Sequence, residues 1–446
     1  MPSRTEKPLR VAVLADSDTR WKWGALTAHR LAPGARLDGC LLRGRATPTG
    51  RQLAEVGVRA ETLREVTMTE FVRTADRSRY DVVVLACVGG AVQAALHGLA
   101  HAWGTGPARP VVVTGYVGVV YEKLADGLLL RHGADVVLAN SPDDAHRFRA
   151  VYEGVGAPAD SVAEWALPFL ADTSDAGDKV IDAEGARLGP FTVVFAAQPS
   201  VPERRADRAY LLRRAAAHAR LHPGREVLIK LRSKPGEHTT HIEEHPYQKL
   251  AAKLPGGLPP NCRLVYGHMG DVLDRTDLLV TVSSTAALEA LHRAIPTAVL
   301  TDLGIREGLG NHHFLGSGCL ASWDRLDAGH LPVPDPGWTA RQGVATDGPY
   351  AHGTAFDAAR RRVAALAARP GLPPLAPYYT ARTAPGYLPG ILARHGLDPE
   401  GRPLPGRAGA PAEAGALRRA VREAARGAYR HGVQRVAPVI RRLGEL

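Results

Sequence analysis

At 446 residues, the chain is too long for one ordinary hydrophobic core, which indicates two domains. Hydrophobic residues make up 45% and charged residues 23%, and no apolar run approaches roughly 18 residues, so no transmembrane helix is expected. The net charge is +11, but eight arginines against two glutamates from residue 416 onward supply more than half of it. Nucleic-acid binding by the folded body is therefore the least favoured function, because it needs basic residues on the folded face.

The first half of the chain alternates apolar runs with helical patterns, which is typical of parallel α/β units. The predicted strands are 10–15, 37–42, 81–87, 110–115 and 134–140. They are apolar at consecutive positions, as expected where helices cover both faces of a sheet. A second series follows at 191–197, 225–231, 262–267, 277–282 and 296–302. This pattern predicts an α/β protein with two Rossmann-like, doubly wound domains facing across a ligand-binding cleft.

The domain boundaries follow from composition. We predict an N-terminal domain over 1–172, a linker of small and polar residues over 173–189, and a second domain over 190–369. A Pro/Gly-rich segment over 370–415 and a basic amphipathic helix over 416–446 complete the chain. Two interpretations of that helix are open: it lies peripherally on an anionic membrane surface through 416–443, or it packs back on the first domain.

The cysteines and the N-terminus indicate the compartment. The start of the chain runs into an apolar strand without a signal-peptide core. The cysteines lie far apart and form no CxxC pair: Cys40, Cys87, Cys262 and Cys319. Both features favour a reducing environment and a cytoplasmic protein, and they disfavour a structural zinc site.

The stretch TVSSTAALEAL places three hydroxyls between a predicted strand and a predicted helix. A helix N-terminus offers unpaired N–H groups and a partial positive charge, so Ser283, Ser284 and Thr285 are predicted to bind a phosphate. Glu289, one and a half turns further on, is predicted to reach a ribose hydroxyl. The alternative is that Ser284 or Thr285 merely caps the helix.

Cationic residues gather at the end of another predicted strand, in the stretch IKLRSKPGEHTTH. Lys230 and Arg232 are predicted to neutralise a leaving phosphate. The loop that follows adds Gly236, Glu237 and His241 to the predicted nucleotide-binding residues. The histidines of this loop match no specific zinc pattern, so no metal is predicted.

The first strand is followed by ADSDTRWKWG. One carboxylate of Asp16 and Asp18 fits a general base that deprotonates an acceptor hydroxyl. Lys22 and Trp23 are assigned to the acceptor side, where Trp23 and Trp21 could offer a stacking face to a sugar ring. The alternative is that Asp16 caps a helix and that Trp23 packs in the core.

These three stretches together resemble a bacterial glycosyltransferase family that carries a DSD…KW motif, a KLR…PGE…TH stretch and a TVSSTA.LEA turn. Here the motifs read Asp16 to Asp18 with Lys22 and Trp23, then Lys230 to Arg232 with 235–237 and 240–241, then 281–290. The similarity covers about residues 8–322 and implies a GT-B-like fold.

The second half is more distantly similar to bacterial sialyltransferases, polysialyltransferases and glycerophosphotransferases, which carry a serine pair and an HP motif. The serine pair is present as Ser283 and Ser284, but Arg232 to Pro235 stand where the HP motif is expected.

The resemblance implies a metal-independent glycosyltransferase without a cofactor. It would move a sugar from a nucleotide-activated donor to a hydroxyl of a cell-surface polysaccharide, a lipid-linked glycan or a similar acceptor. Two alternatives remain: a nucleotide-sugar epimerase of the two-Rossmann type, and a non-catalytic nucleotide-sugar-binding protein.

Overall fold

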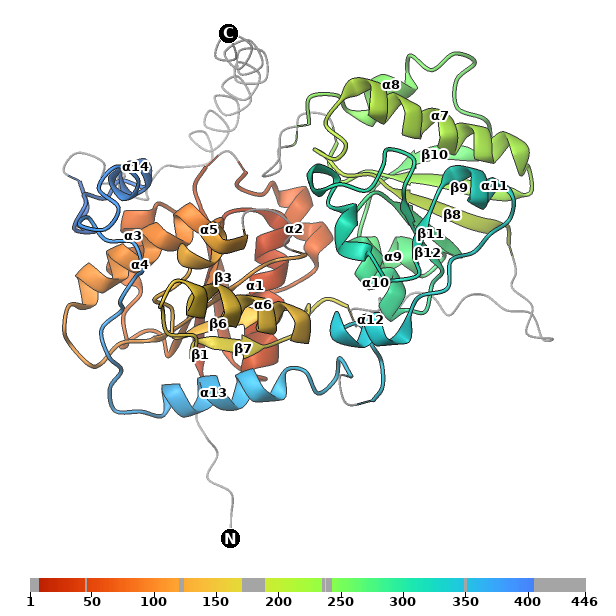
Figure 1. The fold of residues 1–446 in the computed structure, drawn as a ribbon. Helices are drawn as coiled ribbons and strands as arrows, with labels where there is room; N and C mark the ends of the chain where they lie inside the picture. Colours follow the sequence, from red (N-terminus) through yellow and green to blue (C-terminus); the bar gives the residue numbers. More distant parts are fainter. Residues whose placement is uncertain are drawn as a thin grey trace.

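Two parallel sheets with interleaved helices make up the protein (Figure 1). The computed structural model describes residues 8–44, 46–119, 124–170, 189–234, 237, 243–348 and 351–404. Within these residues the first sheet has the strand order β3-β2-β1-β4-β5-β6-β7 and the second has the order β10-β9-β8-β11-β12-β13. The fold class that the sequence predicts is thus present in both halves.

The strands of the first sheet are β1 Arg10–Ala15, β2 Arg36–Leu42, β3 Thr62–Val66, β4 Val82–Ala86, β5 Val111–Gly115, β6 Val136–Ala139 and β7 Val162–Glu164. Those of the second are β8 Phe191–Ala196, β9 Arg225–Lys230, β10 Cys262–Val265, β11 Leu278–Thr281, β12 Thr297–Leu300 and β13 Leu320–Ala321.

The helices of the first half are α1 Asp18–Leu31, α2 Gly50–Val56, α3 Met68–Thr74, α4 Gly89–Trp103, α5 Leu124–Leu129 and α6 Pro142–Gly154. Those that follow are α7 Arg205–Leu221, α8 Tyr247–Ala251, α9 Met269–Leu273, α10 Ala286–His292, α11 Trp323–Asp327, α12 Pro336–Arg341, α13 Asp357–Ala367 and α14 Leu388–Arg394, with 3-10 turns at Glu307–Leu309 and Asn311–Phe314. No helix of the described segments is long and apolar enough to cross a membrane.

The central strands are buried on both faces, which explains their unbroken apolar runs. Every residue of β1 after Arg10 is buried, and so is every residue of β4. The edge strand β3 was not predicted from the sequence, because its residues TLREV are mostly exposed and alternate with charges.

Each sheet reverses its winding at one point, between β1 and β4 in the first sheet and between β8 and β11 in the second. In open α/β sheets, ligands bind outside the carboxyl ends of the strands at such a reversal. The loops after β1 and β4 and those after β8 and β11 are therefore where a site is expected, and the loop after β9 is adjacent because β9 pairs with β8.

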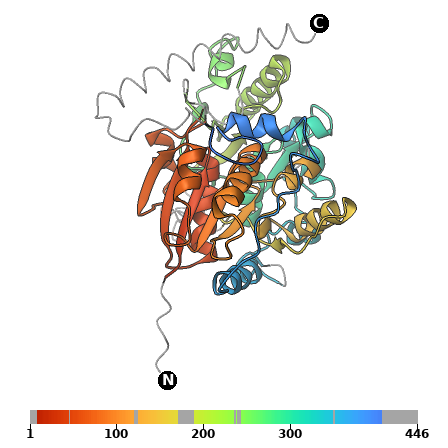
Figure 2. The same cartoon turned by 90° about the vertical axis from the view of Figure 1, so that its left-hand side faces the viewer.

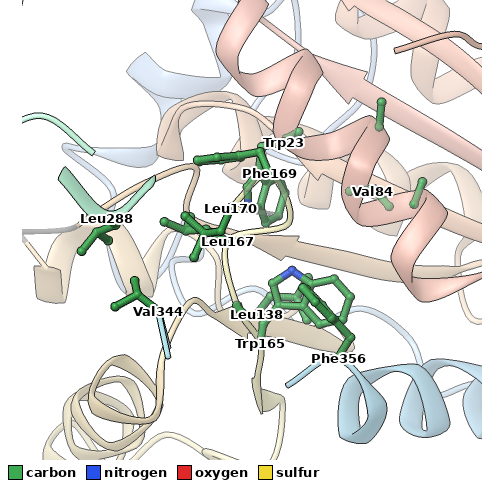
Figure 3. Packing of buried hydrophobic residues seen from close by; sticks show 14 of the residues in the cluster. Trp23, Val84, Leu138, Trp165, Leu167, Phe169, Leu170, Leu288, Val344 and Phe356 are labelled. Atoms are coloured by element: carbon green, nitrogen blue, oxygen red, sulfur yellow. The ribbon is translucent and has the colours of Figure 1, made fainter. Parts of the chain in front are cut away.

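Apolar residues after β7 fill the space between the two sheets. Leu167, Phe169 and Leu170 are buried in the same cluster as Leu288 of α10 and Val344 (Figure 3). A shared core of this kind restrains how the two domains move relative to each other.

The chain returns to the first domain after the second sheet. Helix α13 contacts α1, β5, β6 and β7, and α14 contacts α4. The Trp165 and Phe356 rings meet edge to face, with centroids 4.6 Å apart. In Figure 2 the segment between α13 and α14 runs over the first domain from one helix to the other.

This return differs from the predicted boundaries. Residues 357–367 lie in the range assigned to the second domain, but Phe356 and Val363 are buried among side chains of the first domain. The segment 370–415, predicted to be irregular, contains α14, whose Leu388, Ile391 and Leu392 are buried. The predicted linker over 173–189, except for its last residue, and the predicted helix over 416–446 lie outside the described residues.

Candidate functional site

The turn after β1 gives its two carboxylates different partners. Asp16 accepts hydrogen bonds from the Val88 amide at 2.9 Å and from the Arg20 guanidinium at 3.1 Å, so it holds the turn within the first domain. Ser17 caps α1 through a hydrogen bond from the Arg20 amide, and Asp18 is the first residue of that helix. Of the two predicted bases, Asp18 is the one with a partner in the second domain.

Arg232, two residues beyond β9, joins the two domains. Its guanidinium donates to Asp18 Oδ1 at 2.7 Å and also to the Thr19 hydroxyl. The side chains of Asp18 and Arg232 are 15% and 27% exposed, so the pair is partly shielded from water. Shielding strengthens the attraction between opposite charges relative to a pair on the open surface.

Lys230 ends β9 as a buried cation. The residue is 6% exposed, and its Nζ donates to the Leu231 carbonyl at 2.7 Å. Burial lowers the pKa of Lys230 to about 8, while the charges of Glu55 and Glu289 act in the opposite direction and that of Arg232 reinforces the lowering. Lys230 therefore still carries its proton at pH 7, and a desolvated ammonium favours an anionic ligand.

Two further polar contacts cross between the domains beside this pair. Lys22 Nζ lies 2.8 Å from His268 Nε2, and the Arg51 guanidinium donates to the carboxylate of Glu237. His268 lies in the short turn between β10 and α9, and Lys22 belongs to α1. The carboxyl edges of both sheets therefore face each other, as the sequence predicts for a two-domain binding site.

The Ser283 hydroxyl supports the turn after β11 from inside the domain. Ser283 is fully buried; its Oγ donates to the Leu309 carbonyl at 2.6 Å, and its amide donates to Gln198 Oε1 at 3.0 Å. The prediction that this hydroxyl contacts a phosphate is therefore corrected, because packing and hydrogen bonds close it off from any ligand.

The rest of this turn also satisfies much of its own hydrogen bonding. The Ser284 amide donates to Thr281 Oγ1 at 3.1 Å, and Ser284 Oγ accepts from the Ala286 amide at 3.2 Å. Thr285 precedes α10 without forming a side-chain cap. Ser284 and Thr285 are half-buried, so a phosphate contact from either stays a prediction. Buried Glu289 lies near enough to Lys230 to act on its pKa, and its predicted ribose contact is likewise untested.

The loop after β5 touches the same turn from the first domain. A Cβ at Gly118 would lie 2.6 Å from Thr285 Oγ1, which is closer than side chains approach in proteins. Asn140, after β6, holds this loop by donating to the Tyr116 carbonyl at 2.6 Å. The lack of a Cβ at Gly118 therefore lets the two domains approach this closely.

The predicted aromatic face for a sugar is wrong. Trp23 and Trp21 are 0% and 1% exposed, because one side of α1 packs on the sheet and Trp23 lies beside Phe169 (Figure 3). The alternative, a core tryptophan, holds for Trp23. Lys22, between them, faces the interface and lies 5.4 Å from the centroid of the Phe169 ring.

Other functional candidates were not identified from the sequence. Arg51 and His268 carry contacts between the domains, Gln198 anchors the serine turn, and each of these side chains is polar and lies at or near the end of a strand or the start of a helix. A polar residue directly after a predicted strand was the available signal for His268 and Gln198. Gly236 and His241 lie outside the described residues.

One group has the ligand spacing for a metal ion, away from this interface: His218, His222 and Asp327. His218 Nδ1 lies 2.6 Å from Asp327 Oδ1, and Arg225 lies 3.2 Å from the other ring nitrogen of His218. Arg214 donates to the second oxygen of Asp327 at 2.9 Å. The guanidiniums of Arg225 and Arg214 already contact two of the potential ligand residues, His218 and Asp327. The group is therefore better suited to holding α7 against α11 than to binding a cation.

Comparison with known families gives one match over most of the chain. Residues 11–366 match the family described as "Putative glycosyltransferase (DUF6716)". A search of curated proteins found no match.

Solved structures share the two-domain fold. A structure titled "putative UDP-N-acetylglucosamine 2-epimerase" from Listeria monocytogenes is 11% identical and has a TM-score of 0.51, covering 79% of this chain and 94% of its own. A UDP-GlcNAc 2-epimerase from Neisseria meningitidis bound to UDP-GlcNAc is 12% identical, with a TM-score of 0.47. The match covers 80% of this chain and 100% of the epimerase. A glycosyltransferase from Streptomyces nogalater is 15% identical, with a TM-score of 0.40. The match covers 81% of this chain and 100% of that glycosyltransferase. At such identities the likeness shows the fold alone, and it confirms the predicted fold class.

Proposed function

The chain belongs to this glycosyltransferase family, and from that premise we propose that it moves a sugar from a nucleotide-activated donor to a hydroxyl acceptor. The predictions of a glycosyltransferase and of an enzyme are confirmed at the level of the class. The nature of the donor, the acceptor and the role of each residue are our proposals. The resemblance of the second half to sialyltransferases and glycerophosphotransferases stays a prediction.

One observation carries the proposal: a carboxylate of the first domain pairs with a cation of the second, next to a second and buried cation, where the carboxyl edges of the two sheets face each other. Asp18 begins α1 after β1, Lys230 ends β9, and Arg232 lies two residues beyond it. A cation pair beside a carboxylate matches the two needs of glycosyl transfer, which are charge stabilisation on the leaving group and a base for the nucleophile.

In the proposed transfer step, Asp18 accepts the proton of the acceptor hydroxyl, whose oxygen forms a bond to the anomeric carbon. The bond from that carbon to the donor phosphate breaks, and its electron pair leaves on the phosphate oxygen. Lys230 and Arg232 stabilise the resulting negative charge, so the step as proposed requires neither a metal nor another cofactor. A single displacement of this kind inverts the anomeric centre.

The experiment is a calorimetric titration of the protein with UDP, GDP, CDP, CMP and TDP. We expect one nucleotide to bind, and Lys230→Ala to weaken that binding strongly while the variant remains folded. Failure of every nucleotide to bind would defeat the proposal, as would an unchanged affinity in Lys230→Ala. Asp18→Asn should lose turnover and still bind the nucleotide, which separates binding from chemistry.

The alternative function, a nucleotide-sugar epimerase, uses the same fold, so an epimerase and a transferase have to be distinguished by their reaction products. The nucleotide-sugar that corresponds to the bound nucleotide is incubated alone with the protein. An isomer of the sugar indicates an epimerase, and release of nucleotide only when an acceptor is added indicates a transferase. Binding without either reaction indicates a non-catalytic binding protein.

A glycan or lipid-linked acceptor is proposed from the family resemblance and from the arginine-rich residues 416–443, which an anionic membrane attracts. We accordingly propose a cytoplasmic location at the inner face of the membrane. Co-sedimentation of the full chain and of residues 1–412 with phosphatidylglycerol vesicles tests the contact. Equal sedimentation of the two chains contradicts it.

A further inference from the structure

Asp18 and Arg232 are in direct contact in the structure. The distance of 2.7 Å between Arg232 Nη2 and Asp18 Oδ1 leaves no room for another group between them. In the proposed reaction, however, the acceptor hydroxyl must lie between Asp18 and a sugar bound on the second domain. The contact described by the structure is therefore a resting arrangement that has to separate before transfer.

The same guanidinium is placed to serve either of two anions. Arg232 donates to Asp18 and to Thr19 of α1, whereas its position two residues after Lys230 also suits a phosphate bound at the end of β9. A phosphate offers Arg two parallel charge-assisted hydrogen bonds, which a single carboxylate oxygen does not. Neighbouring Lys230, whose Nζ donates to the Leu231 carbonyl, adds a second cation for the phosphate.

We propose that Arg232 is a positioning residue that holds Asp18 until a donor phosphate takes the place of the carboxylate. The inference rests on the proposed function and adds an order to it, because the donor binds first and its binding releases the base for the acceptor. In the absence of donor, the ion pair also links the two domains.

If carboxylate and phosphate compete for Arg232, removing the carboxylate should strengthen nucleotide binding. A residue that acts only as a base would not produce this gain. Asp18→Asn removes the negative partner of Arg232, so the nucleotide no longer has to displace it. We expect the nucleotide that binds the wild-type protein to bind Asp18→Asn about three- to tenfold more tightly in calorimetric titration. Asp18→Ala, which keeps no acceptor oxygen, should show at least the same gain.

A matched control separates the specific pair from a general loss of negative charge. Asp16→Asn removes a carboxylate from the same turn, but the partners of Asp16 are Arg20 and Val88 rather than Arg232. Its nucleotide affinity should stay within about twofold of wild type. In an Arg232→Gln background, the gain from Asp18→Asn should vanish, and thermal unfolding of each variant confirms that it is folded.

The outcomes separate this inference from the function on which it rests. Wild-type protein that binds no nucleotide defeats the proposed function. Wild-type binding with an unchanged or weakened affinity in Asp18→Asn overturns the exchange alone. An equal gain in Asp16→Asn, or a gain that persists with Arg232→Gln, also overturns the exchange. Either result would mean that the gain in nucleotide affinity comes from a general loss of negative charge and not from the Asp18–Arg232 pair.

Discussion

The turn after β11 and the end of β9 lie in the same sheet and face the same interface, yet they differ in how their polar groups are satisfied. Ser283 and Ser284 find most of their hydrogen bonds within the second domain, with Leu309, Gln198 and Thr281 among their partners. At the end of β9, by contrast, Arg232 reaches Asp18 in the other domain, and Lys230 donates to the Leu231 carbonyl.

This contrast shows which kind of polar group is available to a ligand. Small hydroxyls at a turn are close to the backbone and form local hydrogen bonds at little entropic cost. At the end of β9 the Arg232 guanidinium reaches into the other domain, and the buried Lys230 ammonium has the Leu231 carbonyl as its hydrogen-bond partner. A desolvated ammonium gains more from an anion than a paired hydroxyl does. The site is thus defined by the charges of β9 more than by the hydroxyls after β11.

The largest effect is expected when Lys230→Ala is compared with Ser284→Ala. Removal of the buried cation should weaken nucleotide binding about 100-fold, because a desolvated charge contact with phosphate is lost. Loss of the Ser284 hydroxyl should change the affinity by less than about threefold. Calorimetric titration of both variants checks this, and similar losses in the two would contradict the difference between the regions.

Ser283→Ala should act on stability instead. The Leu309 carbonyl and the Gln198 side chain would lose a buried partner, so the free energy of unfolding should fall by about 1–3 kcal/mol. Urea denaturation followed by tryptophan fluorescence measures this. Ser284→Ala, at a half-buried hydroxyl, is the control with an expected loss below about 1 kcal/mol; an equal loss in both variants argues against the anchoring role of Ser283.

The pH dependence of nucleotide affinity sharpens the assignment of Lys230. The pKa of Lys230 is lowered to about 8 by burial, so the ammonium is charged below that pH and neutral above it. Nucleotide affinity should therefore fall as pH rises through about 8, by at most about tenfold per pH unit. In Lys230→Arg the guanidinium stays charged, so the decline should disappear; a decline that persists assigns it to another group.

The smallest expected effect concerns the contact between the domains at Gly118. Gly118→Ala places a Cβ against Thr285 Oγ1 and should destabilise the protein by about 1 kcal/mol, as overpacking does. Adding Thr285→Ala removes that oxygen and should restore the stability in urea denaturation. If the double variant is no more stable than Gly118→Ala, the contact is not the cause.

Much of the fold could be predicted because it depends on local pattern. The buried strands β1, β4 and β8 are apolar along their length, so they stand out in the sequence, whereas edge strand β3 does not. The return of α13 to the first domain was missed because composition does not report which sheet a helix covers. Trp23 was misassigned for a similar reason: a tryptophan after a strand is equally compatible with a sugar site and with a core.

The sequence by itself determined the fold class and the strand ends at which Asp18, Lys230 and Arg232 lie, since hydrophobic periodicity and chain order decide both. Only the tertiary structure decided what each of these groups meets. Asp18 and Arg232 are 214 residues apart in the chain, and Ser283 finds its acceptor at Leu309, so neither partnership is visible in a local pattern. Burial and pairing arise when two domains and their loops pack together, and these determine which polar groups are already satisfied and which can bind a ligand.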